Sequence, residues 1–281
     1  MSARPMLGTG MRNPTIRLPA VAGHFYPSDP RELAQQIDRY CVSAGDKARA
    51  LGCVVPHAGY MYSGHVAGAV YSVSQIPARC ILVGPRHFPR GEPMAIMTSG
   101  RWRTPLGETQ IDSQMAAELM RACSHLRDDD VAHAREHSLE VQIPFLQRLA
   151  GDFQFVPIVL ATDRYEELEG LGHAIGEVVK TQDGPVLIIA SSDMNHYESD
   201  RITRVKDRRA IDRILALDPR GLYETVRSEG ITMCGYAAAV TMLVSVLDLG
   251  AKDAKLVKYA TSGDINGDRE EVVGYAGLIL N

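Results

Sequence analysis

Three histidines of this 281-residue chain, His57, His87 and His196, each follow a run of apolar residues. The run before His196, residues 186–190, is wholly apolar and typical of a strand buried on both faces of a sheet. Open α/β sheets bind their ligands at the carboxyl ends of the strands. We therefore expect polar chemistry to gather where these strands end.

Two histidines and one anionic residue on separate strand ends could hold a metal ion and leave coordination positions open, as in non-haem Fe(II) enzymes. Imidazole also suits zinc and copper, so the residue types do not select the metal. Cys234 lies in a glycine-flanked turn at the start of an expected helix, where the helix dipole favours a thiolate. The chain has no HExxH and no CxxC pair, so spacing alone does not join these residues. For each of the histidines, the alternative to a metal ligand is a hydrogen-bonded residue of the core.

A second candidate group precedes the helix expected over residues 139–147. Ser138 can cap this helix, and Pro144 is expected to kink it. The helix start would hold His137 and Glu140 close together as a paired base and carboxylate. The signal is weak, because the same spacing occurs in many structural helices.

Other chemistries find less support in the sequence. The glycines of residues 59–68 do not form a phosphate-binding GxxxxGK[ST] loop, and the GxGxxG and GxSxG motifs are absent. On paper, a triad could be formed by His196 with the run Ser191-Ser192-Asp193. Neighbouring strand residues point to opposite sides of the sheet, however, which argues against it.

Strand and helix alternate along the chain, which predicts a single α/β domain over residues 18–281. Residues 1–17 are expected to form a loose N-terminal arm. No linker or internal repeat interrupts the alternation. The main expected strands are 52–55, 80–83, 153–160, 186–190, 256–260 and 272–280, and the expected helices include 31–43, 62–71, 112–123, 139–147, 200–217 and 237–249.

The composition is that of an ordinary globular protein, with 45% hydrophobic and 23% charged residues. The net charge of −4 gives no general reason to bind nucleic acid or an anionic membrane. We find no apolar run long enough to span a bilayer and no secretory signal. Five cysteines without close pairs favour a reducing cytoplasm.

Several motifs of the chain, in this order, resemble those of the Memo family. The resemblance runs from about Leu18 to the C-terminus. The motifs are Pro56-His-Ala-Gly-Tyr60 with Tyr62-Ser-Gly64, Gly84-Pro-Arg-His87, Glu136-His-Ser-Leu-Glu140, Ser191-Ser-Asp-Met-Asn-His196, Cys234-Gly235 and Tyr275-Ala276.

The Memo family is similar in fold to the class III extradiol ring-cleavage dioxygenases. The resemblance thus implies one α/β domain with a central mixed, largely parallel sheet flanked by helices. By this resemblance, His57 and His87 match metal-binding histidines, and Cys234 matches the third metal contact, where the dioxygenases have a glutamate. His196 matches the acid/base histidine of the dioxygenases. The remaining matches to the Memo pocket are Asp193, which we expect to steady His196, and His137 and Glu140.

A thiolate in place of a carboxylate softens such a site and adds an oxidisable ligand. Ring cleavage therefore cannot be inherited from the fold. We expect a metal-dependent redox protein or enzyme that binds one ion, Fe(II) first, with copper or zinc as alternatives. A zinc-dependent hydrolase is a weaker possibility.

A regulator that binds a peptide or small molecule in the same pocket, without turnover, is the main alternative function. The resemblance implies phosphotyrosine-peptide binding in animal members of the family. In microbes, it implies a functional link to a radical-SAM protein and a second partner protein.

Overall fold

The computed structural model describes residues 15–42, 45 and 47–281. Its centre is four parallel strands in the order β8 (Gln154–Leu160), β3 (Arg79–Pro85), β9 (Leu187–Ser191) and β2 (Gly52–Val55). Almost every residue of these strands is buried, because helices cover both faces of the sheet. The antiparallel strand β12 (Val272–Leu280) continues the sheet beyond β2.

Seven further strands extend the sheet to twelve strands within the described residues. These are β1 (Ile16–Arg17), β4 (Met94–Ile96), β5 (Arg101–Thr104), β6 (Gly107–Ile111), β7 (Arg127–Asp128), β10 (His196–Glu198) and β11 (Ala254–Thr261). Strand β8 pairs with β6 in parallel but with β4 in antiparallel orientation. The sheet is therefore mixed, although its centre is parallel.

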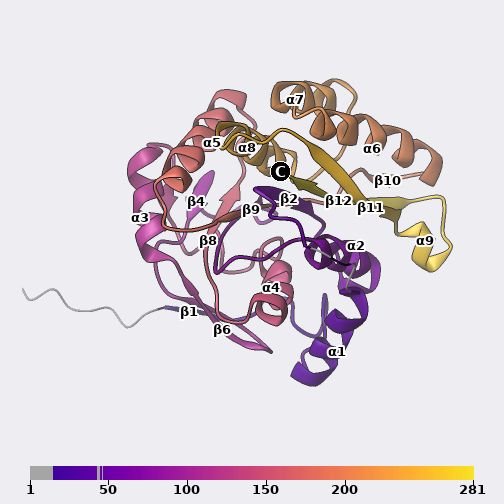
Figure 1. The fold of residues 1–281 in the computed structure, drawn as a ribbon. Coiled ribbons are helices and arrows are strands. Elements are labelled where there is room, and N and C mark those ends of the chain that lie inside the picture. The colour runs from indigo at the N-terminus through magenta and orange to yellow at the C-terminus, as the bar shows by residue number, and fades with distance from the viewer. Residues whose placement is uncertain (1–14, 43–44, 46) are drawn as a thin grey trace, which may run out of the picture.

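The helices form two layers (Figure 1). The core on one face contains residues of α1 (Pro30–Tyr40), α2 (Tyr60–Val73) and α4 (Ile143–Ala150). The core on the other face contains residues of α3 (Ser113–Ala122), α5 (Tyr165–Lys180), α6 (Asp200–Leu215), α7 (Pro219–Ser228) and α8 (Tyr236–Asp248). The single turns η1 (Glu140–Gln142) and α9 (Gly263–Asn266) complete the helical elements.

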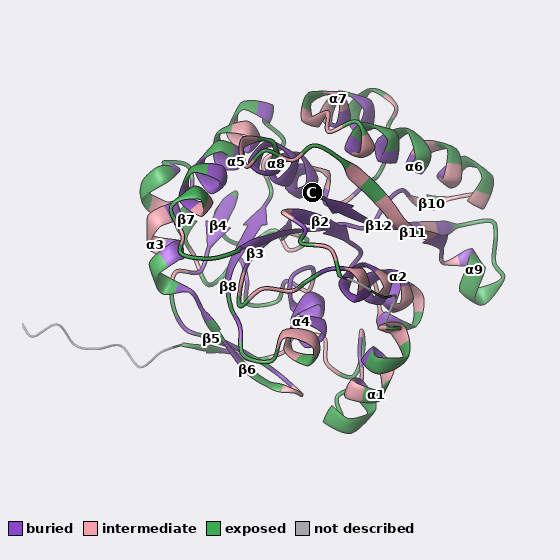
Figure 2. Ribbon diagram, viewed as in Figure 1, coloured by how far each residue is buried: buried purple, intermediate pink, exposed green. Residues whose placement is uncertain are grey.

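Strand β3 shows how the sequence divides its side chains between the two layers. Ile81 and Val83 lie in the core under α8, whereas Cys80 and Leu82 lie in the core under α2 and α4. This alternation is the two-residue period of an extended strand. Figure 2 shows the result, with buried strands in the middle and exposed residues on the outer faces of the helices.

Helix α8 is apolar on all sides because it is buried between the sheet and the neighbouring helices. Every residue from 237 to 246 is buried, and the helix contacts β2, β3 and β9 as well as α5. Cys234, two residues before this helix, lies against the end of the sheet, where its Sγ accepts a hydrogen bond from the N–H of Asp193. None of the helices in the described part is both long and apolar enough to cross a membrane.

The predicted α/β class with a mixed, largely parallel sheet is confirmed, while three local predictions need correction. Residues 1–14 of the predicted arm lie outside the described residues, but Ile16–Arg17 form a strand that pairs with β5. Pro144 does not kink a helix: it lies in the first turn of α4, where its missing N–H costs nothing. Glu140, which was expected in the same helix as Pro144, lies in the separate turn η1 before α4.

Candidate metal centre

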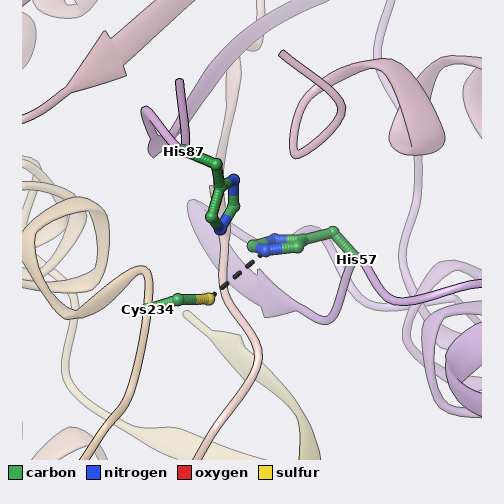
Figure 3. A group of neighbouring side chains, drawn as sticks. All are labelled: His57, His87 and Cys234. Carbon is green, nitrogen blue, oxygen red and sulfur yellow. Dashed lines mark hydrogen bonds between the residues drawn. The ribbon is translucent and has the colours of Figure 1, made fainter. Parts of the chain in front are cut away.

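Three side chains from distant parts of the chain converge at the carboxyl end of the parallel strands (Figure 3). His57 follows β2, His87 follows β3, and Cys234 precedes α8. Their potential ligand atoms all lie within 4.8 Å of one another. The Cys234 Sγ lies 3.3 Å from the His57 Nε2, and the rings of His57 and His87 meet edge to face at 5.3 Å.

Gly235 allows Cys234 to come this close to the sheet. A Cβ at residue 235 would overlap the carbonyl oxygen of Ser191, the last residue of β9. The N–H of Gly235 donates a hydrogen bond to the Ser192 Oγ at 3.0 Å. Only glycine fits this contact between the start of α8 and the end of β9.

The surroundings of the half-buried Cys234 disfavour the ionised form of its thiol. Burial, together with the nearby Asp193 carboxyl group, raises the pKa of this thiol. Both effects oppose the thiolate that the sequence led us to expect at the start of α8. A coordinated cation would reverse this balance, because metal ions bind the deprotonated sulfur.

Asp193 supports both His57 and Cys234 through the backbone. Its Oδ1 accepts hydrogen bonds from the N–H groups of His57, at 2.7 Å, and Ala58, at 3.3 Å. Its own N–H donates to the Cys234 Sγ at 3.3 Å. Its carboxylate thus contacts the start of the loop after β2, and not the ring of His196 as expected.

His57 is almost fully buried, at 2% exposure. Burial lowers the pKa of its imidazole well below the ordinary value, and the nearby imidazoles of His137, His87 and His196 lower it further. His57 is therefore neutral near pH 7 and offers a lone pair on one ring nitrogen.

Glu136 is a site residue that the sequence analysis missed. Its buried carboxylate accepts hydrogen bonds from the Nδ1 of His87, at 2.8 Å, and from the N–H groups of His87, His137 and Ser138. Although burial opposes ionisation, these hydrogen bonds lower the pKa of Glu136 to about 2. Since the carboxylate only accepts, the neutral form of His87 carries its proton on Nδ1 and presents the lone pair of Nε2. In the sequence, the only signal for Glu136 was its position directly before the candidate residue His137.

Glu136, His87 and His137 also lie close enough to form a second trio of potential ligands. We assign no second ion to them, because a hydrogen-bonded proton already fills the 2.8 Å space between the Glu136 Oε1 and the His87 Nδ1. This trio supports His87 as a ligand instead.

His137 and Glu140 do not form the expected pair. His137 stacks on His87, with ring centroids 4.5 Å apart, and its carboxylate neighbour is Glu136 at 3.6 Å. Burial lowers the pKa of His137 to about 4. The Glu140 carboxylate accepts hydrogen bonds from Arg17, Tyr26 and the N–H groups of residues 20 and 21, away from the His137 ring.

His196 belongs to the same end of the sheet but rests on the loop before α8. Its N–H donates to the Oγ1 of Thr232 at 2.7 Å, and its Nδ1 lies 2.9 Å from the Thr232 carbonyl oxygen. A carbonyl oxygen only accepts, so the Nδ1 is protonated, and in the neutral ring the lone pair lies on the Nε2. Thr232 is a second support that the sequence analysis missed.

Comparison with known proteins places this arrangement in a family. The family model described as "Memo-like protein" matches residues 17–279. A MEMO1 family protein of Methanopyrus kandleri is 43% identical over 278 residues, which cover 94% of this chain and 98% of that protein. A MEMO1 family protein of Pyrobaculum arsenaticum is 41% identical, with 95% and 99% covered. The chain, which carries a possible His/His/Cys metal-binding group, therefore belongs to the Memo family.

Proposed function

We propose that this protein is a mononuclear, metal-dependent redox enzyme whose ion is held by His57, His87 and Cys234. The observation that supports the proposal is the convergence of these three side chains, with ligand atoms within 4.8 Å, at the carboxyl end of the parallel strands. Three protein ligands leave coordination positions open for a substrate, as in non-haem Fe(II) enzymes.

The donor atoms fit such an ion. The lone pair of the His87 Nε2 is available because Glu136 accepts the proton of its Nδ1. Cys234 adds a soft sulfur donor, which suits Fe(II) and also admits copper or zinc. When bound, a redox-active ion would supply one-electron transfer chemistry to this pocket.

His196 would move the proton of the reaction. Its Nδ1–H is engaged by Thr232, so its Nε2 can take a proton from a bound substrate and return it. His137, buried beside His87, would form the wall of the pocket, and Asp193 would hold the backbone of His57 in place.

A binding protein without turnover is the second candidate, and Tyr197 favours it. This tyrosine is 73% exposed and has a φ of 59°, a conformation that few non-glycine residues adopt. Its ring lies 5.5 Å from that of His196, where it could stack on a peptide or small molecule. Such binding would survive removal of the ion.

The redox proposal is tested by loading the protein anaerobically with Fe(II) and titrating it with a mild oxidant. A reversible one-electron cycle at about one equivalent of iron is expected. Uptake of zinc alone, or iron that leaves the protein on oxidation, would contradict a redox role. Ligand binding that is equal with and without chelator would favour the second candidate.

A further inference from the structure

The hydroxyl group of Ser191, at the end of β9, has three partners in a fully buried position. Its Oγ lies 3.0 Å from the Nδ1 of His57, 2.9 Å from the Nε2 of Gln142 and 2.6 Å from the carbonyl oxygen of Ser138. Ser191 and Ser138 are 0% exposed, and Gln142 is 1% exposed. These buried polar groups must therefore find their hydrogen-bond partners within the protein.

The single proton of this hydroxyl must point to Ser138. A carbonyl oxygen only accepts, and two oxygens at 2.6 Å require a proton between them. The Oγ of Ser191 is thus left with its lone pairs for the other two partners, and both of those partners must donate.

The Gln142 side chain can donate because its orientation is fixed by two further contacts. Its Nε2 also donates to the carbonyl oxygen of Pro56 at 3.0 Å, and its Oε1 accepts from the hydroxyl of Tyr71 at 2.8 Å. The reverse orientation would set the amide oxygen against the Pro56 oxygen, with no proton between them. Gln142 therefore donates to Ser191.

The third partner, the Nδ1 of His57, must then carry a proton as well. We propose that Ser191, held by Gln142, is a positioning residue that fixes His57 in the Nδ1–H tautomer and so makes Nε2 the ligand atom. The Nε2 is also the nitrogen that faces Cys234, at 3.3 Å. The tautomer follows from the hydrogen bonds alone, whereas its use in binding an ion rests on the proposed function.

The same hydrogen bonds place the ring as well as its proton. Gln142 contacts both Ser191, which touches the His57 ring, and Pro56, the residue before His57. Gln142 lies in η1, close in the chain to Glu136, which supports His87. One segment, residues 136–142, thus supports both ligand histidines, His87 through an anionic acceptor and His57 through a neutral one.

The tautomer can be measured in the metal-free protein. In protein labelled with ¹⁵N-histidine, long-range ¹H–¹⁵N spectra near pH 7.5 distinguish a protonated ring nitrogen from one with a lone pair. The His57 signals are assigned by their loss in His57→Ala. We expect a protonated Nδ1 and a lone pair on Nε2. A protonated Nε2 would overturn the proposal, whether or not the protein binds metal.

The role of Ser191 is tested by Ser191→Ala, with Ser74→Ala as the matched control. Ser74 is also 0% exposed and donates to a carbonyl oxygen, that of Val70, within α2. Ser191→Ala should move the His57 proton to Nε2 in part and weaken Co(II) binding roughly 10–100-fold, whereas Ser74→Ala should do neither. Gln142→Met, which keeps the Ser191 hydroxyl, should retain the Nδ1–H tautomer.

An unchanged tautomer in Ser191→Ala, with Co(II) affinity equal to that of Ser74→Ala, would overturn the role of Ser191. If Ser191→Ala does not fold, the spectrum of the wild-type protein still decides the tautomer. A confirmed tautomer in a protein that binds no Co(II), Fe(II) or Zn(II) would contradict the proposed function and leave the tautomer standing.

Discussion

Two buried glutamates, Glu136 and Glu140, stand four residues apart and accept four hydrogen bonds each, yet they serve different regions of the molecule. Both are 0% exposed. Glu136 accepts from the ring and backbone of His87 and from the next two N–H groups of its own segment. Glu140 accepts from Arg17, Tyr26 and two N–H groups of the N-terminal segment.

The comparison shows that the partner of a buried carboxylate, and not its burial, decides its role. Glu136 sets the tautomer of a candidate metal ligand. Glu140 neutralises a buried guanidinium, at 2.7 Å, and holds β1 onto the domain. Arg17 connects the two regions, because it also donates to the carbonyl oxygens of Glu136 and His133.

Removing the Glu140 carboxylate should have the largest effect on stability. Glu140→Ala leaves Arg17 buried without its counter-ion, which typically costs about 3–5 kcal/mol of unfolding free energy. Urea denaturation measures this loss. The double variant Arg17→Met/Glu140→Ala should recover part of it, since no buried charge then remains unpaired. A loss below about 1 kcal/mol in Glu140→Ala would remove the basis of the comparison.

The matching change at Glu136 should act on metal binding. Glu136→Gln replaces the anionic acceptor behind His87 and should weaken Co(II) or Zn(II) binding roughly 10–100-fold, as expected for a residue that orients a ligand. Glu140→Gln is the matched control, with little effect on affinity per folded molecule. Equal affinities of the two variants, measured by competition with a chelator, would contradict the different roles of the two glutamates.

A third buried carboxyl group, that of Asp207 on α6, sharpens the comparison because neutral groups donate to it. It accepts from the Tyr259 hydroxyl, at 2.6 Å, and from the Asn195 N–H, at 2.8 Å. Burial raises its pKa to about 7, and these two hydrogen bonds offset only part of the shift. By contrast, the hydrogen bonds from the ring and backbone of His87 and from the backbone of Ser138 hold the pKa of Glu136 near 2.

The two shifts predict opposite dependences of stability on pH. A raised pKa favours the folded state at low pH, so the contribution of Asp207 is lost as pH rises from about 4 towards 7. The contribution of Glu136 is present above its ordinary pKa and is lost as pH falls towards 2. Between pH 5 and pH 8, the wild-type protein should lose about 1 kcal/mol or more relative to Asp207→Asn. A difference that is constant with pH, or that has the opposite sign, would contradict this assignment.

The sequence predicted the strand ends well because buried strands are marked by local composition. The apolar residues 53–55 before Pro56, and 186–190 before Ser191, suffice to place β2 and β9. Because both strands are buried on both faces, they show no alternation of polar and apolar residues. The convergence of His57 with Cys234, 177 residues apart, depends instead on strand order and on the close contact at Gly235. Family resemblance, and not spacing, suggested that pair.

The supporting residues were missed for a related reason. Glu136 and Glu140 look alike in sequence, and the expected helix would have placed Glu140 beside His137. The segment forms the turn η1 before α4, and this directs the Glu140 carboxylate to Arg17. Ser191, Gln142 and Thr232 are neutral polar residues whose roles arise only from long-range hydrogen bonds.

The central claim, a metal ion held by His57, His87 and Cys234, is tested most directly by the metal content of anaerobically purified protein. Wild type is compared with His57→Ala and with His65→Ala, a histidine of α2 outside the converging trio. We predict about one equivalent of iron or copper in wild type and His65→Ala, and none in His57→Ala. Folded proteins that all lack metal and take up no added Fe(II), Cu(I) or Zn(II) would contradict the claim.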